Sequence, residues 1–231
     1  MKISVVIRTH NEEKTIGELF EKLKSQTFHD FETVLVDNAS TDKTLEIARK
    51  YKIDKLINIP KGKFSHSKSL NDAIRIVSGD LIVILNGHSI PIDNNWLEKG
   101  LKNFKDSKVA AISGDYIYAD TPILNPVKRI RMSNANLSNT NSIIRKYLWE
   151  KYHFDEDLSG VEDYDWGLEM QSRGFKIIKD PGFMVRHYHR ITPETRKYWA
   201  EMIEVISAKN RKKSLMQKTI FRLKRVTYKY L

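Results

Sequence analysis

The sequence predicts an α/β protein built on a mostly parallel sheet with helices on both faces. Strand-like and helix-like segments alternate through the first 110 residues, and each strand is short, apolar and rich in β-branched side chains. Strand, helix and strand in succession form the unit that builds a parallel sheet. With 231 residues and no cysteine, the chain can bury a full core without disulfides, and thiolate metal sites and cysteine nucleophiles are excluded.

The elements of the first half follow in order. Residues 2–7 and 32–36 are typical strands, and between them residues 12–25 repeat apolar side chains at the spacing of a helix packed on a sheet. The pattern continues as helix, strand, helix, strand and helix over residues 44–51, 55–59, 67–77, 81–85 and 94–104. Asp93 is the expected N-cap of the last of these helices.

The second half is less regular. A strand is expected over residues 108–118, and residues 119–141 are polar, contain two prolines and predict a long loop. A helix over residues 162–172 is expected to end at Gly174. It is followed by strands over 175–178 and 183–187 and then by a long helical segment.

The positive charge is concentrated at the C-terminal end. The formal net charge is +11, but no acidic residue follows Glu204, while nine lysines and arginines do, so residues 1–204 carry only +2. This distribution argues against a nucleic-acid-binding protein. We therefore predict a domain over 1–204, made of an alternating α/β half (1–110) and a less regular half (111–190), and a basic amphipathic helical tail over 205–231.

The tail has two interpretations. It either lies on an anionic membrane surface, as basic amphipathic helices do, or folds back on the domain with its basic face in solvent. The apolar run at the N-terminus is too short for a signal peptide, and no stretch approaches the roughly 18 apolar residues of a spanning helix. We expect a cytoplasmic protein. If the first interpretation of the tail holds, the protein also binds peripherally to the inner face of the cell membrane.

Polar residues follow three of the predicted strands. Thr9 and Glu12 come after the first, Asp37 after the second, and Asn86 and His88 after the strand 81–85. Because ligands bind at the carboxyl ends of strands in such sheets, these residues mark a candidate site. Neither of the first two turns is glycine-rich, which excludes the dinucleotide fingerprint and the P-loop. The competing interpretation is that Asp37 makes only turn hydrogen bonds.

Four segments resemble family 2 glycosyltransferases with the GT-A fold, in the same order and over residues 2–190. They are KISVVIRTHNEEKTIGELFEKLKSQTF, FETVLVDNASTDKTLEIARKY, SLNDAIRIVSGDLIVIL and FDEDLSGVEDYDWGLEMQSRGFKI. The resemblance implies an inverting, rhamnosyltransferase-like transferase of cell-envelope polysaccharide synthesis. Its donor would be a UDP- or dTDP-linked sugar, and its acceptor a hydroxyl of a saccharide or lipid-linked saccharide. Residues 1–110 would then form the nucleotide-sugar half and residues 111–190 the acceptor half.

The resemblance also assigns roles. Thr9, Glu12 and Asp37 match positions that hold the nucleotide, and Asp163, with Glu162 beside it, matches the general base that takes the acceptor's proton. An inverting transfer needs one such carboxylate opposite the departing nucleotide. Acids at the start of a helix also stabilise it electrostatically, and the two interpretations can both hold.

Other matches are weaker. Lys63 or His66 matches a loop that reaches the nucleotide or its phosphates, unless that loop is solvated and Ser67 only caps the helix. The acceptor side would include Asn139, Asn141 and Trp166, with Trp166 either stacking on a sugar or buried in the core.

Asn86-Gly87-His88 stands where the family has Asp-x-Asp, which holds a divalent cation on the diphosphate. Three hypotheses follow. His88 with His187 or His189 binds a metal such as Mn²⁺ or Mg²⁺, of which imidazole favours manganese-like ions. Alternatively, these groups and Arg190 contact phosphate without metal. In the third, catalysis is lost and the chain is a sugar-nucleotide- or glycan-binding module.

Overall fold

The computed structural model describes residues 1–119, 137–158 and 160–188, together with 193, 197–198, 200–204 and 206. The chain divides into two compact units, Met1–Arg190 and Ile191–Leu231, and the first unit contains the sheet. The predicted loop lies mostly outside the described residues, which omit 120–136. The proposed division at residue 204 and the amphipathic tail over 205–231 stay predictions.

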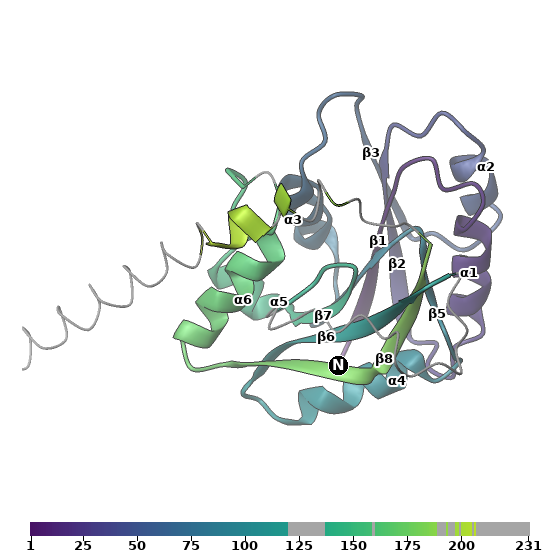
Figure 1. Cartoon of the computed structure of the whole chain (residues 1–231). Coiled ribbons are helices and arrows are strands. Elements are labelled where there is room, and N and C mark those ends of the chain that lie inside the picture. Colours follow the sequence, from purple (N-terminus) through teal and green to yellow (C-terminus); the bar gives the residue numbers. More distant parts are fainter. Residues whose placement is uncertain are drawn as a thin grey trace, which may run out of the picture. The chain divides into compact units, whose positions relative to one another are not determined.

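The core of the first unit is a mixed sheet of eight strands in the order β3-β2-β1-β4-β7-β6-β8-β5 (Figure 1). The strands are β1 (Ile3–Thr9), β2 (Phe31–Asn38), β3 (Lys55–Ile59), β4 (Leu81–Asn86), β5 (Ser89–Pro91), β6 (Val109–Tyr118), β7 (Asn141–Arg145) and β8 (Lys176–His187). The four strands from β3 to β4 are parallel, β7 is antiparallel to both its neighbours, and β6 and β8 are parallel. The predicted α/β fold is confirmed.

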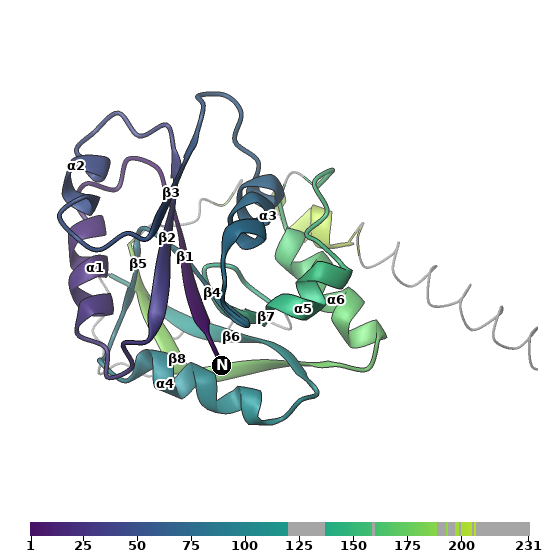
Figure 2. The ribbon, with the colours of Figure 1, turned by 180° about the vertical axis from the view of Figure 1, so that it is seen from behind.

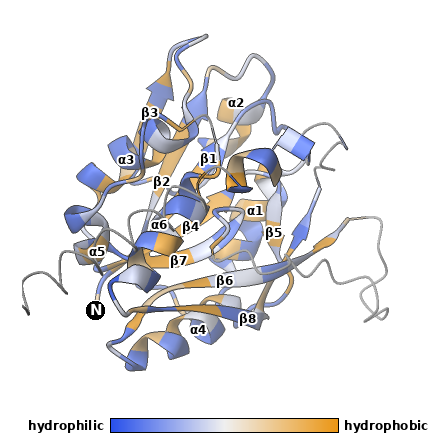
Figure 3. Cartoon of the chain, turned by 60° about the vertical axis from the view of Figure 1, so that its left-hand side comes forward, coloured by the Kyte–Doolittle hydropathy of each residue, from blue (hydrophilic) through white to orange (hydrophobic). Residues whose placement is uncertain are grey.

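Helices cover both faces of the sheet (Figures 1 and 2). They are α1 (Ile16–Lys24), α2 (Thr44–Ala48), α3 (His66–Ile76), α4 (Trp96–Leu101) with the 3₁₀ turn η1 (Lys102–Lys105), α5 (Lys146–Lys151) and α6 (Glu162–Ser172). One buried apolar cluster joins the sheet to α1 and α4, and the other joins it to α3, α5 and α6. The central strands are accordingly hydrophobic along their length, as strands buried on both faces should be (Figure 3).

Several local predictions were wrong. The N-cap position of α4 is Asn95, two residues later than predicted, and Asp93 instead pairs with the Lys99 ammonium at 2.5 Å. Ser65 rather than Ser67 caps α3, its side chain accepting from the Lys68 amide, while Ser67 is fully buried.

The irregular second half also differs from its prediction. β8 is one long strand instead of two, since it follows β6 along its length with register shifts. The short elements β5, β7 and α5 were not predicted. Gly114 in β6 shows how tightly these strands pack, since a β-carbon there would collide with the Phe183 carbonyl oxygen.

Candidate active site

The parallel strands bring their carboxyl ends to one edge of the sheet. Arg8 lies directly beside Asn86 on β4, and Thr9 lies beside Asp37 on β2. Side chains alternate between the faces of a strand, so Arg8 and Asn86 point to the face covered by α3 and α6, whereas Thr9 and Asp37 point to the face covered by α1. The site therefore has two sides, separated by the ends of β1 and β4.

Asp37 is a buried carboxylate with one oxygen left over. The residue is 2% exposed, and its Oδ2 accepts a hydrogen bond from the Ser40 amide at 3.0 Å. Within the described ranges, neither its Oδ1 nor the buried Thr9 hydroxyl has a hydrogen-bond partner. A buried polar atom without a partner costs about 1–3 kcal/mol, so both atoms are suited to meeting a ligand. Turn hydrogen bonds account for only one of the two Asp37 oxygens.

The start of α6 holds two adjacent carboxylates. Asp163 accepts from the Asn139 amide through Oδ2 and from the Tyr164 amide through Oδ1, both at 2.8 Å. The Asn139 side chain donates to Glu162 Oε1 at 3.3 Å, and Arg8 Nη1 lies 3.6 Å from the same oxygen. We call Arg8, His66, Asn139, Glu162 and Asp163 the carboxylate cluster.

The carboxylate cluster perturbs two ionisable groups. Burial, followed by the negative charge of Glu162, raises the pKa of Asp163 to about 7, against the opposing effect of its hydrogen bonds and Arg8. Burial, followed by the Arg8 charge, lowers the pKa of His66 below its usual range and so favours the neutral ring, against the opposing charge of Glu162. Asp163 is thus able to exchange a proton near neutral pH.

A second group of side chains lies around the turn after β4. His88 Nδ1 contacts Glu12 Oε1 at 2.5 Å, and the rings of His88 and His187 meet edge to face with centroids 4.7 Å apart. The His187 ring is buried, and its Nδ1 lies 3.1 Å from the Ser89 hydroxyl. The structure thus brings together three residues that the sequence named separately.

These described residues do not fit a divalent ion. Nowhere in the described ranges do three or more His, Cys, Asp or Glu side chains gather so that they could hold a metal. The Asn86 side-chain oxygen, which stands where a metal-binding carboxylate would, accepts from Arg8 Nη2 at 3.3 Å. His189 and Arg190 lie outside the described residues, so a metal site that includes His189 stays a prediction.

The predicted acceptor residues are mostly structural. Trp166 is fully buried and its indole donates to the Tyr152 carbonyl at 2.8 Å, so it packs in the core and does not form a sugar-stacking wall. Asn141 is also buried and donates to the Phe183 carbonyl at 2.7 Å. Asn139 instead orients both carboxylates of the cluster, and Lys63 is exposed in the loop before α3.

Arg8 is a site residue that was not predicted from the sequence. Its side chain is only 11% exposed, and it contacts Asn86, His66 and Glu162. The available signal was a single cation at the end of an otherwise apolar strand, since a buried charge is retained only with partners.

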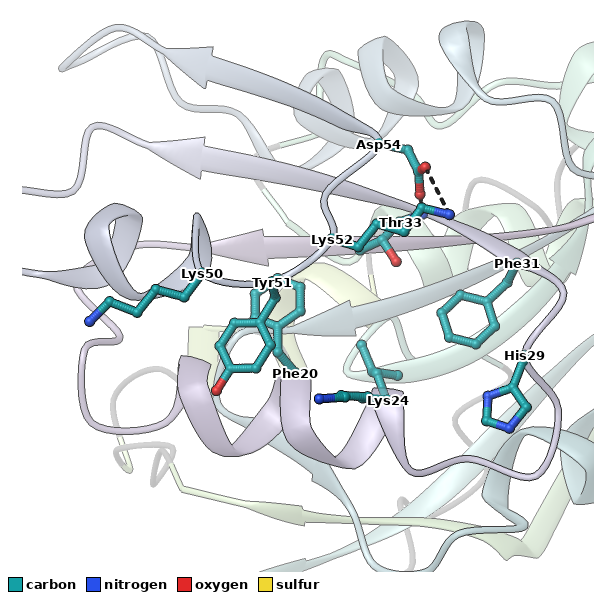
Figure 4. A pocket seen from close by; sticks show the side chains of 10 residues that line it. Phe20, Lys24, His29, Phe31, Thr33, Lys50, Tyr51, Lys52 and Asp54 are labelled. Carbon is teal, nitrogen blue, oxygen red and sulfur yellow. Dashed lines mark hydrogen bonds and ion pairs between the residues drawn. The ribbon is translucent and has the colours of Figure 1, made fainter.

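A separate hollow lies at the other end of β2. This cavity has a volume of about 330 Å³. Its lining includes Phe20, which stacks on Tyr51, together with Phe31, Thr33, Lys24, Lys50 and Lys52 (Figure 4). Because Phe31 and Thr33 begin β2 while Asp37 lies near its end, the hollow is distinct from the candidate site.

The fold and site define a class of protein. The architecture is the GT-A fold, and it matches the glucosyl-3-phosphoglycerate synthase of Mycobacterium tuberculosis, solved with Mn²⁺, UDP and phosphoglyceric acid, with a TM-score of 0.69 at 16% sequence identity. The match covers 90% of this chain and 78% of that one. At this identity the likeness shows the fold alone.

The chain belongs to glycosyl transferase family 2, whose model matches residues 4–170. It is 23% identical over 222 residues to the O-antigen chain rhamnosyltransferase RfbN of Salmonella typhimurium, covering 86% of this chain and 71% of that protein. It is 27% identical over 206 residues to the O-antigen chain rhamnosyltransferase WbaN of Salmonella anatum, covering 79% of this chain and 65% of that protein. The chain therefore spans slightly less than two thirds of WbaN. Among the described residues, no helix is long and apolar enough to cross a membrane.

Proposed function

We propose that this protein transfers a sugar, with inversion, from a nucleoside diphosphate sugar to a hydroxyl of a saccharide or lipid-linked saccharide. The observation that supports this most directly is the environment of Asp163. Its carboxylate is held in place by two backbone amides and has its pKa raised to about 7 by burial and by Glu162. A general base works best with a pKa near the operating pH.

In the proposed step, the acceptor oxygen attacks the anomeric carbon while Asp163 takes the proton of that hydroxyl. The bond from the anomeric carbon to the phosphate oxygen breaks, and its electron pair leaves on the nucleoside diphosphate. The products are the glycoside with inverted configuration, the nucleoside diphosphate and a protonated Asp163. Asn139 positions the base through its amide, and Glu162 keeps the base basic by repelling a second negative charge.

The nucleoside of the donor would lie on the other side of the site. The free oxygen of Asp37 and the free hydroxyl of Thr9 are acceptors for the N–H and O–H groups of a base or ribose. Glu12 and His88 line the same side of the strand ends. Lys63, in the exposed loop before α3, would reach the phosphates from solvent.

The acceptor is proposed from the relatives. RfbN and WbaN are named as O-antigen chain rhamnosyltransferases, which supports a saccharide acceptor in cell-envelope glycan synthesis. Their names give less direct support for a UDP- or dTDP-linked donor. The basic pattern over 205–231 supports attraction to an anionic membrane surface, where a lipid-linked saccharide would be presented.

The test has two stages. A thermal-shift screen of UDP- and dTDP-sugars first identifies the donor, because a ligand that binds only the native state raises its apparent stability. Release of nucleoside diphosphate is then compared between the wild type and Asp163→Asn, which keeps the shape of the side chain but cannot take a proton. We expect a loss of about 10²–10⁴-fold in turnover, with donor affinity changed less than threefold.

Asp157→Asn is the matched control, since Asp157 is an exposed carboxylate in the turn before α6. It should keep full turnover. If Asp163→Asn turns over as fast as the wild type, Asp163 is not the base. Donor binding without any turnover in the wild type would favour the second candidate, a non-catalytic sugar-nucleotide-binding module, which is suggested by Asn86-Gly87-His88 in place of two acids.

A further inference from the structure

We propose that Arg8 supplies the positive charge that receives the donor's diphosphate, and that this chain binds nucleoside diphosphates without a divalent metal ion. The inference rests on the proposed function, because it concerns how the same site holds its donor. In enzymes with Asp-x-Asp, a bound cation offsets the negative charge of the diphosphate, whereas here the Arg8 side chain of β1 would offset it.

The position of Arg8 is the first argument. A donor whose nucleoside meets Asp37 and whose sugar faces Asp163 must cross the sheet edge, since these carboxylates lie on opposite faces. The ends of β1 and β4 separate the two sides, and Arg8 is paired there with Asn86 in the β1–β4 register. The guanidinium therefore lies on the path that the diphosphate must take.

The identity of residue 86 is the second argument. An aspartate there would add a second carboxylate beside Arg8, which already lies 3.6 Å from Glu162, whereas the asparagine adds no charge and accepts a hydrogen bond from Nη2 at 3.3 Å. A divalent ion bound to the same amide oxygen would lie a few ångströms from the guanidinium and be repelled by it. A neutral amide beside a guanidinium is therefore a poorer cation ligand than the carboxylate it replaces, so the replacement of the acid and the presence of Arg8 are consistent with each other.

The partners of Arg8 are the third argument. Its Nη1 lies 3.3 Å from His66 Nδ1 and 3.6 Å from Glu162 Oε1, so the guanidinium is fixed between the first residue of α3 and the first residue of α6. A guanidinium has five N–H groups in a planar fork, which matches the geometry of phosphate oxygens. Because a guanidinium can only donate, His66 Nδ1 is the acceptor in this contact, and the ring proton lies on Nε2, which can act as a second donor.

The experiment compares a nucleoside with its diphosphate. Binding of UDP and uridine, and of dTDP and thymidine, is measured by calorimetry in excess EDTA and again with 5 mM Mn²⁺, for the wild type and Arg8→Met. We expect Arg8→Met to weaken diphosphate binding at least tenfold and nucleoside binding less than twofold. Adding Mn²⁺ should change the wild-type affinity for the diphosphate less than threefold.

Three controls separate charge from folding. Arg49→Met removes an exposed arginine at the end of α2 and should leave both affinities unchanged. Arg8→Lys keeps the charge but not the fork, and should recover part of the diphosphate affinity. If Arg8→Met does not fold because Glu162 is left buried without its cation, the comparison is made in the Glu162→Gln background, where that charge is absent.

The outcomes are distinguishable. If no diphosphate binds the wild type with or without Mn²⁺, the proposed function fails and this inference with it. If diphosphates bind the wild type only when Mn²⁺ is present, the proposed function stands and the inference is overturned. Equal weakening of nucleoside and diphosphate by Arg8→Met also overturns it, because Arg8 would then have only a structural role.

Discussion

Two carboxylates at opposite ends of the sheet have opposite shifts in acidity. Glu32, at the amino end of β2, accepts from the Ser4 hydroxyl at 2.6 Å, the Ser78 amide at 2.5 Å and the Lys55 ammonium at 3.0 Å. Burial alone would raise its pKa, but these hydrogen bonds outweigh it and lower the pKa to about 2. At the carboxyl end, burial and the Glu162 charge outweigh the two amides and raise the pKa of Asp163 to about 7.

The backbone shows the same contrast. Among the described residues, three non-glycine residues have positive φ, namely Asn11 (54°), Ala39 (49°) and Val161 (57°). They follow β1, follow β2 and precede α6, so all three flank the candidate site. Such conformations cost about 1–3 kcal/mol each and persist only where the surrounding structure enforces them. The amino end of the sheet is built for stability, and the carboxyl end holds strained and incompletely paired groups that suit chemistry.

The largest expected effect is on the pH dependence of stability at Asp163. A carboxylic acid whose folded pKa is raised from about 3.8 to about 7 contributes stability at low pH that is lost as the pH rises through this range. The wild type should therefore lose about 3 kcal/mol relative to Asp163→Asn between pH 5 and pH 8. Urea unfolding of both proteins at five pH values measures the difference. If the free energies of unfolding of the two proteins change in parallel with pH, the pKa of Asp163 is not raised, and Asp163 and Glu32 do not differ in the way inferred.

Glu32 should show the opposite sign. Its folded pKa lies below its unfolded value, so its contribution is fully present above about pH 4.5 and is lost as the pH falls towards 2. Because its side chain is 16% exposed and partly screened, we expect Glu32→Gln to lower the free energy of unfolding by about 2 kcal/mol at pH 7. Denaturant curves at pH 7 and pH 3 test this.

The control for this prediction is Glu46→Gln. Glu46 pairs with Lys50 on the surface, with 65% of its side chain exposed, and its loss should cost less than about 0.5 kcal/mol. If Glu32→Gln lowers the free energy of unfolding at pH 7 by no more than Glu46→Gln does, the hydrogen bonds of Glu32 do not stabilise the fold as inferred.

The regular half of the fold was predictable because its signals are local. The β-branched runs and the i, i+3, i+4 spacing located β1 to β4 and α1 to α4 from neighbouring residues alone. β7 was missed because it forms by pairing with strands that are distant in the sequence, and α5, which directly follows β7, was missed with it. In β7, Asn141–Arg145 are strand residues because they lie between β4 and β6. The continuity of β8 likewise depends on β6 rather than on its own sequence, which contains Asp180, Pro181 and Gly182.

The site was predictable in its acids but not in what holds them. Asp37 lies near the end of β2, and Glu162 and Asp163 begin α6, which are positions that sequence spacing reveals. Asn71 shows the limit, since its buried amide accepts from the Trp149 indole and the Phe154 amide and donates to the Phe154 carbonyl. Its partners lie about 80 residues away, and no spacing rule joins them. Arg8 was missed for the same reason, because its partners Asn86 and Glu162 are also distant in the sequence.

The smallest expected effect concerns Glu162, whose charge is, after burial, the second cause of the raised pKa of Asp163. Replacing it with glutamine removes the like charge that raises the pKa of Asp163, so this pKa should fall and the base should stay ionised at lower pH. The acidic limb of the pH dependence of kcat/KM, which reports the free enzyme and lies near pH 7 in the wild type, should move down by about one unit, equivalent to about 1.4 kcal/mol. Glu169→Gln, on the same helix and paired with Arg173, should leave the limb in place. An unchanged limb in Glu162→Gln would mean that burial alone raises the pKa of Asp163, and the contrast between the two ends of the sheet would then rest on burial instead of charge.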